Sequence, residues 1–417
     1  MVEKKNNFLL KISGNLFILI PIFLVTGPFL SDLALSIIVI FFLIFIYKEK
    51  KFDVFKNNFF KIFFFFYIYI VLNSFIQNQN FDSIKISLSY LRFGIFVLAI
   101  IYILDNESII LKKLFNIFLI IFSILIVDGF YQFLKGENIL GYPLVNGVRV
   151  TSLFNDESIL GSYLSRLFPI FFGLLIYLHK KINRFQYALS CILFIFAEVI
   201  IYISGERASF FFMNLSAIFI LMALRNFRKF RLITLLTSLA LIIVVSFAFP
   251  ITKQRVIYQT LDQMGIAEDK KIVMFSHQHN ELYKTAINIF RDNVLIGVGV
   301  KNFRNKCNLD KYKESDFSCS THPHNSYLQL ISELGLIGLI FGILVITIFT
   351  KHIILHFKYK LKNINYFNDF QVCLLSSILI TLWPLVTGNL FNNWLNIIYY
   401  YPVGILLWSF DKKKFAY

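Results

Sequence analysis

Long apolar stretches alternate with short polar connections along almost the whole chain. A helix needs about 20 mainly apolar residues to cross the hydrocarbon core of a bilayer. Stretches of about that length lie at 12–30, 33–47, 59–77, 83–104, 114–134, 159–178, 185–203, 208–224, 232–249, 326–350, 370–389 and 393–410. The pattern therefore predicts an all-α, polytopic membrane protein with about twelve transmembrane helices.

The composition agrees with this class, because 57% of the 417 residues are hydrophobic and 18% are aromatic. One soluble core cannot hide that much apolar surface. The net charge of +17 raises the question of nucleic acid, and the distribution of the charge answers it. A nucleic-acid-binding surface has one continuous basic face. Here the basic residues gather in every second connection, at 48–56, 112–113, 180–184, 225–231, 351–362 and 412–414. We therefore expect membrane lipids, and no nucleic acid, as partners.

Basic connections between transmembrane helices face the cytoplasm. Both termini are then expected to be cytoplasmic, with a retained first helix, because no small-x-small cleavage site follows the basic start of the chain. The opposite connections, at 136–158, 204–207 and 250–325, are expected to be external. The chain then divides into nine helices in 1–249, an external loop domain with short helices in 250–325, and three more helices in 326–417.

Two cysteines of the predicted external domain, Cys307 and Cys319, lie twelve positions apart. An oxidising compartment favours a disulfide between them. Two free thiols, or a zinc site that includes His322 and His324, are the alternatives. Neither a C-x2-C nor an H-x3-H spacing is present, so we expect the disulfide and no metal.

His324 stands where the external segment enters the predicted helix that follows. An imidazole can take and give a proton near neutral pH, and this one is expected at a water-accessible surface. Beyond it, Asn325, Gln329 and Glu333 recur at helical spacing and form a polar stripe. The stripe either lines a wet cavity or is a hydrogen-bonding seam between helices.

Arg207 lies in the tight external corner "SGERASF", where positive residues are disfavoured. A guanidinium suits a phosphate group, because it makes two parallel charge-assisted hydrogen bonds and does not lose its charge. The alternative is an ion pair with Glu206 or Glu198. The external segment adds further basic residues, namely Arg255, His279, Lys284, Arg291, Lys301 and Arg304.

A histidine base beside arginines at the outer membrane surface suits the transfer of a group from a lipid diphosphate. The arginines would stabilise the departing diphosphate, and the histidine would accept the proton of the attacking hydroxyl. No D-x-D pair is present to hold a divalent cation. We therefore expect metal-independent transfer and no cofactor.

Four segments resemble the O-antigen ligase and O-antigen polymerase superfamily of bacterial envelope glycosyltransferases. "HNSYLQLISELGLIG" matches an H-N pair followed, after nine residues, by G-x-x-G; the other three are "RVTSLFNDESILGSYL", "SGERASF" and "FRDNVLIGVGVKNF". Together they cover about 149–345. The resemblance implies about twelve helices, a helical periplasmic domain, and a glycan donor carried on undecaprenyl diphosphate in the inner membrane.

By motif position, the resemblance implies that His324, followed by Asn325, activates the acceptor and that Arg207 is the first phosphate-binding arginine. A second arginine is usual about four residues before the aromatic position that Tyr283 resembles, and His279 stands there instead. Either His279 serves, or Arg255, Lys284 or Arg291 has taken over the role.

The acceptor separates two functions within this superfamily. A ligase uses the lipid A core of lipopolysaccharide, and a polymerase uses another lipid-linked repeat unit. We favour the ligase because of the single large late loop with its His-Asn motif. A function of another class, a lipid-linked oligosaccharide flippase or transporter, would favour repeated halves and polar residues near the middle of the membrane, which the sequence does not show.

Overall fold

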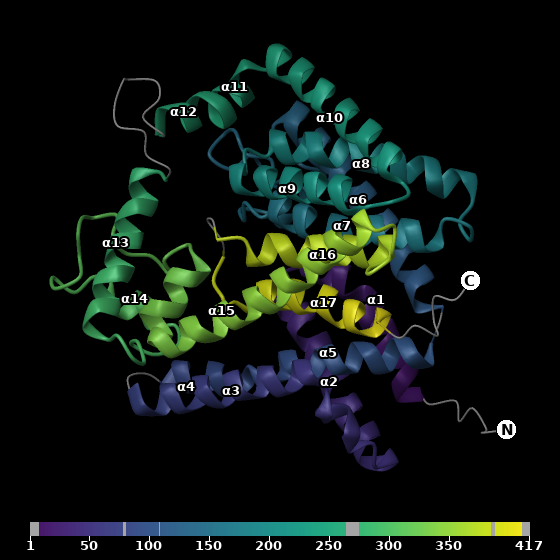
Figure 1. Ribbon diagram of the computed structural model, residues 1–417. Helices are drawn as coiled ribbons and strands as arrows, with labels where there is room; N and C mark the ends of the chain where they lie inside the picture. Colours follow the sequence, from purple (N-terminus) through teal and green to yellow (C-terminus); the bar gives the residue numbers. More distant parts are fainter. Residues whose placement is uncertain (1–7, 78–80, 108, 264–274, 385–387, 411–417) are drawn as a thin grey trace.

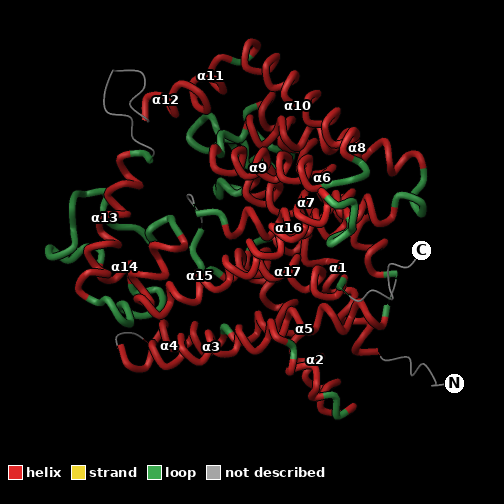
Figure 2. Tube along the Cα trace, in the orientation of Figure 1, coloured by secondary structure: helices red, strands yellow, loops and turns green. Residues whose placement is uncertain are grey.

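The computed structural model describes residues 8–77, 81–107, 109–263, 275–384 and 388–410, and these residues form helices and loops without a strand (Figure 2). The all-α prediction is therefore confirmed. The longer helices are α1 (Phe8–Val25), α2 (Pro28–Glu49), α3 (Asn58–Gln77), α4 (Phe81–Ser89), α5 (Leu91–Asn106), α6 (Ile110–Lys135), α7 (Leu160–Leu178), α8 (Arg184–Ile203), α9 (Arg207–Ala223), α10 (Arg228–Ala248), α13 (His277–Asp292), α15 (Ser326–Leu361), α16 (Asp369–Leu382) and α17 (Asn393–Ser409). The short ones are η1 (Phe52–Lys56), η2 (Ser152–Phe154), α11 (Pro250–Lys253), η3 (Gln254–Tyr258), α12 (Gln259–Gln263) and α14 (Phe303–Lys306).

Nine helical segments within the described residues are long and apolar enough to cross a membrane. They are α1, α2, α3, the pair α4–α5, α6, α7, α8, α10 and α15. Helices α9 and α16 are apolar but shorter. Helix α17, with 17 residues, is also shorter. All three lie at positions where the sequence predicts a span. The chain is thus a multi-pass membrane protein.

Helix α7 lies at the centre of the bundle, between α6, α8, α9 and α16. Its phenylalanines explain this position, because they stack on rings from two neighbouring helices. The Phe168 ring lies 4.8 Å from Phe122 of α6 and 5.0 Å from Phe194 of α8. A second group of helices, α2, α5 and α17, packs beside it. Ring–ring contacts of this kind supply packing energy that the apolar lipid phase does not.

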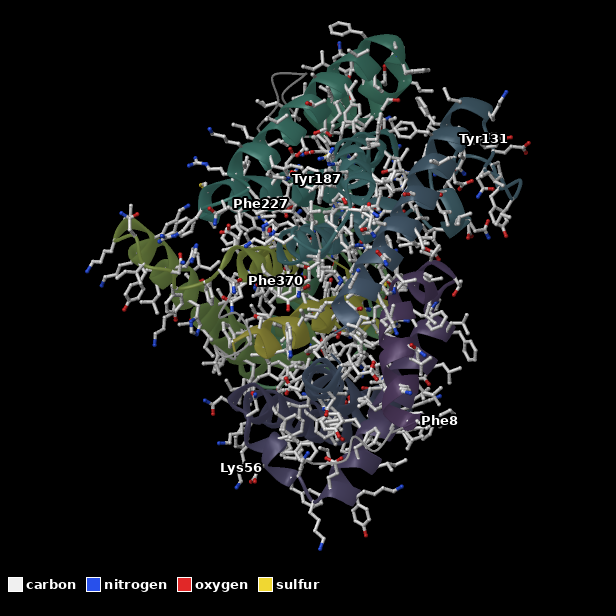
Figure 3. All side chains as sticks on the ribbon, turned by 90° about the vertical axis from the view of Figure 1, so that its right-hand side faces the viewer. Phe8, Lys56, Tyr131, Tyr187, Phe227 and Phe370 are labelled. Atoms are coloured by element: carbon white, nitrogen blue, oxygen red, sulfur yellow. A yellow bond between two sulfur atoms is a disulfide. The ribbon has the colours of Figure 1, made fainter. Side chains whose placement is uncertain are left out.

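The start of α1 and the end of α17 lie on one side of the molecule, at the right of Figure 1, and α13 and α14 lie on the opposite side. Figure 3 turns the first side toward the viewer, with Phe8 and Lys56 labelled on it. Two of the basic connections, 225–231 and 351–362, meet on this side. The Arg225 backbone N–H donates to Asp369 at 3.1 Å, and Lys360 Nζ donates to the carbonyl of Leu224 at 2.9 Å.

Helix α15 is broken at Gly335, which has φ 66° and ψ −160°. The segment 294–300 fills the break and takes over the interrupted backbone hydrogen bonds. Val298 N–H donates to the Ser332 carbonyl at 3.0 Å, and Leu336 N–H donates to the Val294 carbonyl at 2.8 Å. The helix reaches its full length only with a second segment docked against it.

Glu333, buried beside this break, fixes the docked segment further. Its carboxylate accepts the backbone N–H groups of Lys301 and Phe303 at 3.0 and 3.3 Å, and it also accepts from Gln329 Nε2 at 3.0 Å. Gln329 in turn donates to Asn389 Oδ1 at 2.9 Å. Of the two interpretations of the polar stripe, the hydrogen-bonding seam is the one that these contacts support.

Candidate functional site

The corner between α8 and α9 places Arg207 at the first residue of α9. Gly205 makes the turn with φ 70°, a backbone conformation that favours glycine. The side chain of Arg255, from η3, lies directly over this glycine, and a Cβ there would sit 2.5 Å from Arg255 Nε. The glycine therefore brings two arginines from distant parts of the sequence to the same corner.

A third arginine, Arg149, faces the same corner from the hairpin that Val145 and Arg149 close. The pKa of Arg255 is lowered, first by burial and then by the positive charges of Arg149 and Arg207. Buried Nε atoms of Arg149 and Arg255 lack a hydrogen-bond partner, and Arg207 donates to Thr260 Oγ1 at 3.3 Å. Among the described residues, no carboxylate lies within ion-pair distance of these three side chains. The three guanidinium groups therefore form a cationic cluster without an ion pair, and the charge of Arg149 acts at longer range on the Glu206 carboxylate.

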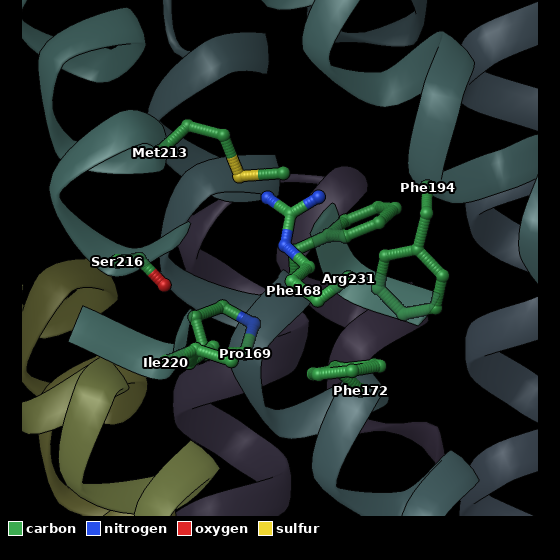
Figure 4. A pocket seen from close by; sticks show the side chains of 8 residues that line it. All are labelled: Phe168, Pro169, Phe172, Phe194, Met213, Ser216, Ile220 and Arg231. Atoms are coloured by element: carbon green, nitrogen blue, oxygen red, sulfur yellow. The ribbon is translucent and has the colours of Figure 1, made fainter. Parts of the chain in front are cut away.

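The two acids proposed as alternative partners of Arg207 are engaged elsewhere. Glu206 caps the start of α7, where its carboxylate accepts from the N–H groups of Gly161 and Ser162 at 2.6 and 2.9 Å. Glu198 accepts from Ser238 Oγ at 2.7 Å and lies 3.8 Å from Arg231. Figure 4 shows Arg231 among the residues that line a cavity of about 10 Å³ between α7, α8, α9 and α10. Neither acid therefore forms an ion pair with Arg207, whose hydrogen bond goes to Thr260 Oγ1.

Two histidines stand beside the arginines. The ring of His279 lies 5.7 Å from that of His324, nearly perpendicular to it. Burial and the charge of Arg207 lower the pKa of His279. Burial, and then His279, lower the pKa of His324 to about 4. The lowered pKa values favour the uncharged form of both imidazoles, which can accept a proton or a hydrogen bond.

Helix caps hold both histidines in place. Ser276 caps α13 and its hydroxyl lies 2.7 Å from His279 Nδ1. Asn325 caps α15, with its Oδ1 accepting from the N–H groups of Tyr327 and Leu328 at 3.0 and 3.2 Å. His324, next to this cap, has φ 55° and its Nε2 lies 3.3 Å from Ser320 Oγ. Cap chemistry of this kind is local and readable in the sequence.

The segment before His324 is also tied to the external helices. A disulfide joins Cys307 and Cys319, with their Cα atoms 5.0 Å apart. Cys307 belongs to an apolar cluster made of Leu282, Tyr283, Ala286, Ile289, Val298, Phe303, Cys307 and Tyr312. The cluster packs α13 against α14, so the helix that carries His279 and the loop that carries His324 share one support.

The structure brings together four of the residues singled out in the sequence: Arg207, Arg255, His279 and His324. Asn325 lies beside them as a helix cap. Arg291 is exposed at the far end of α13, roughly 18 Å from His279 at 1.5 Å per helical residue. Lys284 pairs with Glu281 at 2.9 Å.

Arg149 is the site residue that the sequence analysis did not single out. Its signal was present, because it is the first residue of "RVTSLFNDESILGSYL". Nothing in the sequence itself shows that this loop turns toward the corner of Arg207. Within the described residues, no group of three or more His, Cys, Asp or Glu side chains is arranged to hold a metal ion. Three cations beside two neutral imidazoles are instead suited to an anionic ligand.

Comparison with known proteins gives a domain match over this region. Residues 189–343 match the family model described as O-antigen ligase. The match covers α8 to α10, the segment 250–325 and the first half of α15. It therefore contains Arg207, Arg255, His279 and His324, whereas Arg149 lies before it. No curated protein matches the chain.

Proposed function

We propose that the chain is an O-antigen ligase of the O-antigen ligase/polymerase superfamily, and the match of residues 189–343 to the O-antigen ligase family model supports this proposal. In this proposal it transfers a glycan from undecaprenyl diphosphate to the lipid A core of lipopolysaccharide. The reaction takes place at the periplasmic face of the inner membrane. The distribution of basic residues supports this orientation, with the end of the molecule that carries α13 and α14 in the periplasm and both termini in the cytoplasm. The three predicted parts are retained: helices of 1–249, the periplasmic domain of 250–325, and helices of 326–417. Counting α9, α16 and α17 as spans gives the predicted twelve.

The observation that carries the proposal is the convergence of Arg149, Arg207 and Arg255 without a carboxylate partner. A diphosphate gains negative charge when its bond to the sugar breaks. Fixed guanidinium groups stabilise that developing charge without having to reorganise. Holding three half-buried cations close together beside a membrane is costly unless an anion binds between them.

His324 supplies the proton acceptor. The acceptor hydroxyl attacks the anomeric carbon of the donor sugar, and the bond from this carbon to the diphosphate oxygen breaks. The diphosphate leaves with the bonding electrons, and the hydroxyl proton moves to a ring nitrogen of His324. In the free enzyme, the low pKa of the His324 imidazole keeps the ring unprotonated. The negative charge of the bound diphosphate then raises the affinity of the imidazole for a proton.

His279 occupies the place where the superfamily usually has its second arginine. Its pKa is lowered, so it contributes hydrogen bonds rather than charge. Arg255, which covers Gly205, brings a second guanidinium to the corner from another segment. We propose that Arg255 has taken over the phosphate-binding role and that His279 orients His324.

Two rival functions are separated by phenotype. Deleting the gene should abolish all attached O-chain if the protein is a ligase, but should leave single repeats attached if it is a polymerase. A flippase or transporter would need its polar residues near the middle of the membrane. The cationic cluster instead lies at one end of the spans, which favours chemistry at the membrane surface.

The test replaces His324 by Ala and Arg207 by Ala in cells that lack the chromosomal copy, and it follows the lipopolysaccharide ladder on gels. Both variants should lose the ladder at normal protein level. Lys313→Ala is the matched control, since it removes an exposed external charge whose ion pair with Asp316 lies at the surface. Arg291→Ala decides whether that residue takes part. Retained laddering in His324→Ala would overturn the assignment.

A further inference from the structure

A second candidate site lies at the opposite end of the molecule, between residues 15–19 of α1 and residues 113–117 of α6. A groove of about 420 Å³ opens there, lined by Asn15, Ile18, Leu19, Lys113, Asn116 and Ile117. Three lining residues come from each helix. None of them belongs to the cationic cluster described above, so the groove is independent of the proposed function.

The two asparagines are unusual for the depth at which they lie. Asn15 and Asn116 lie three and two residues inside the predicted apolar stretches 12–30 and 114–134, roughly 5 and 3 Å along the helix axis, near the level of the lipid ester groups. Asn15 is exposed, and Asn116 is half-buried. An amide facing lipid at this depth is unfavourable unless it finds a hydrogen-bond partner. A polar group bound in the groove would supply such a partner.

The hydrogen bonds of the protein leave donors for such an occupant. Asn116 Oδ1 accepts from Gln186 Nε2 of α8 at 2.8 Å, so its own N–H groups are the part left for a ligand. Gly14 lets the two helices approach closely, because a Cβ there would lie 2.9 Å from Ile110 of α6. The amides are consequently held on a rigid helix pair.

Positive charge lies one turn above each amide. Lys113 precedes Asn116 by three residues, and Lys11 precedes Asn15 by four, so each pair shares a helix face. Both lysines are exposed, and neither forms an ion pair with a described carboxylate. Glu107 is the nearby acid, with its Oε2 3.5 Å from the Cβ position at Gly14. Long basic side chains near helix ends reach toward the lipid headgroups.

We propose that this groove binds one anionic phospholipid of the leaflet that faces the basic end of the molecule. The phosphate lies between Lys11 and Lys113, and the ester carbonyls accept hydrogen bonds from Asn15 and Asn116. One acyl chain follows the apolar floor made by Ile18, Leu19 and Ile117. Along the groove, the lysines come first, then the amide donors, and then the apolar residues. A phospholipid presents its phosphate, its ester groups and its acyl chain in the same order.

The experiment titrates the purified full-length protein, stripped of lipid in detergent, with phosphatidylglycerol and counts bound lipids by native mass spectrometry. The variant Asn15→Leu combined with Lys113→Gln should lose one tightly bound lipid. A basic residue near the membrane surface contributes about 1 kcal/mol to binding of an anionic lipid, and about 1.4 kcal/mol corresponds to a tenfold change in Kd. The loss of Lys113 alone should therefore weaken binding roughly fivefold. Lys180→Gln, an exposed lysine at the same end, is the control and should bind as the unaltered protein does.

Three outcomes would overturn the proposal. They are unchanged binding in the double variant, an equal loss in Lys180→Gln, and equal affinity of the unaltered protein for phosphatidylglycerol and phosphatidylcholine. A thermal unfolding scan of each variant keeps the result interpretable, since a misfolded variant would show no cooperative transition. In that case Lys113→Gln alone, at an exposed position, carries the test.

Discussion

The rings of His279 and His324 lie 5.7 Å apart at 87° to each other, one on α13 and the other just before α15. Each helix begins with a side-chain cap, from Ser276 and Asn325. The two helix caps therefore fix the positions of two histidines that come from distant parts of the chain. The pair is also electrostatically coupled, because burial and then the charge of His279 together lower the pKa of His324 to about 4.

The first prediction concerns pH. If neutral His324 is the base, kcat/KM should stay constant as the pH falls through 6.5 and decline only near pH 4, because activity is lost below the pKa of the free enzyme. The value of kcat should decline at a higher pH, because the bound diphosphate raises the pKa of the imidazole. The measurement is glycan transfer by purified protein across this pH range. A decline of kcat/KM centred at 6.5 would contradict the role.

The second prediction tests His279 by the same assay. His279→Ala removes a neighbour that lowers the pKa of His324. The pH at which kcat/KM declines in acid should therefore rise toward the ordinary histidine pKa near 6.5. If His279 only binds the phosphate, its replacement would raise the KM for the donor and leave the pH at which kcat/KM declines unchanged. Comparison of the two readouts therefore separates orientation of the base from donor binding.

The third prediction concerns Arg149. Replacing it by Ala should lower kcat/KM about ten- to hundredfold, since one hydrogen bond to a charged group contributes about 1.5–3 kcal/mol. Arg149→Lys should recover part of the loss, because it keeps the charge without the planar fork. The donor concentration series should show a raised KM. Activity equal to that of the control Lys313→Ala would remove Arg149 from the site.

Arg149 also shows what the sequence left undetermined. His324 and Arg207 were predicted because each lies at a recognisable boundary, a loop entering a helix and a tight corner. Arg149 lies in a hairpin whose direction depends on Asn138 and Gln132, which bind the backbone of 142–152. Such tertiary contacts have no periodic signal. The spans, by contrast, follow from hydropathy alone, since lipid forces every backbone group to be paired within its own helix.

The sequence also did not predict the break in α15. The sequence predicts one continuous span over 326–350, with Gly335 inside it. In the structure it has positive φ because the segment 294–300 supplies replacement hydrogen bonds. A helix alone would not adopt this conformation. The non-local partner decides it, and the polar stripe acquires its role from that same partner.

The fourth prediction concerns the disulfide between Cys307 and Cys319. Closing a loop with a sequence separation of 12 stabilises a fold by about 3 kcal/mol in the chain-entropy estimate. Cys307→Ser with Cys319→Ser should therefore lower the melting temperature. It should also lower transfer activity, because the bond anchors the segment that leads to His324. Reductant should have the same effect on the unaltered protein and none on the double variant. An unchanged melting temperature after complete reduction would contradict the anchoring role.

The fifth prediction concerns the docking of 294–300 into the break of α15. At Gly297 a Cβ would lie 2.4 Å from the carbonyl carbon of Glu333, and at Gly335 it would lie 2.4 Å from the carbonyl oxygen of Leu295. Both obstacles are backbone atoms, which cannot rotate away. Alanine at either position should cost about 3 kcal/mol or more, by adding overpacking to the strain of positive φ.

Gly147→Ala is the matched control for both variants. Gly147 has φ 71° but nothing within 4 Å of its Cβ position, so alanine there brings only the backbone strain, about 1–2 kcal/mol. Thermal unfolding in detergent, with size-exclusion chromatography to monitor folding, measures the difference. If all three variants lost the same stability, the close approach of the two segments would contribute nothing. A larger loss at Gly297 and Gly335 would mean that the external domain and the span after His324 are stabilised by one shared set of backbone contacts.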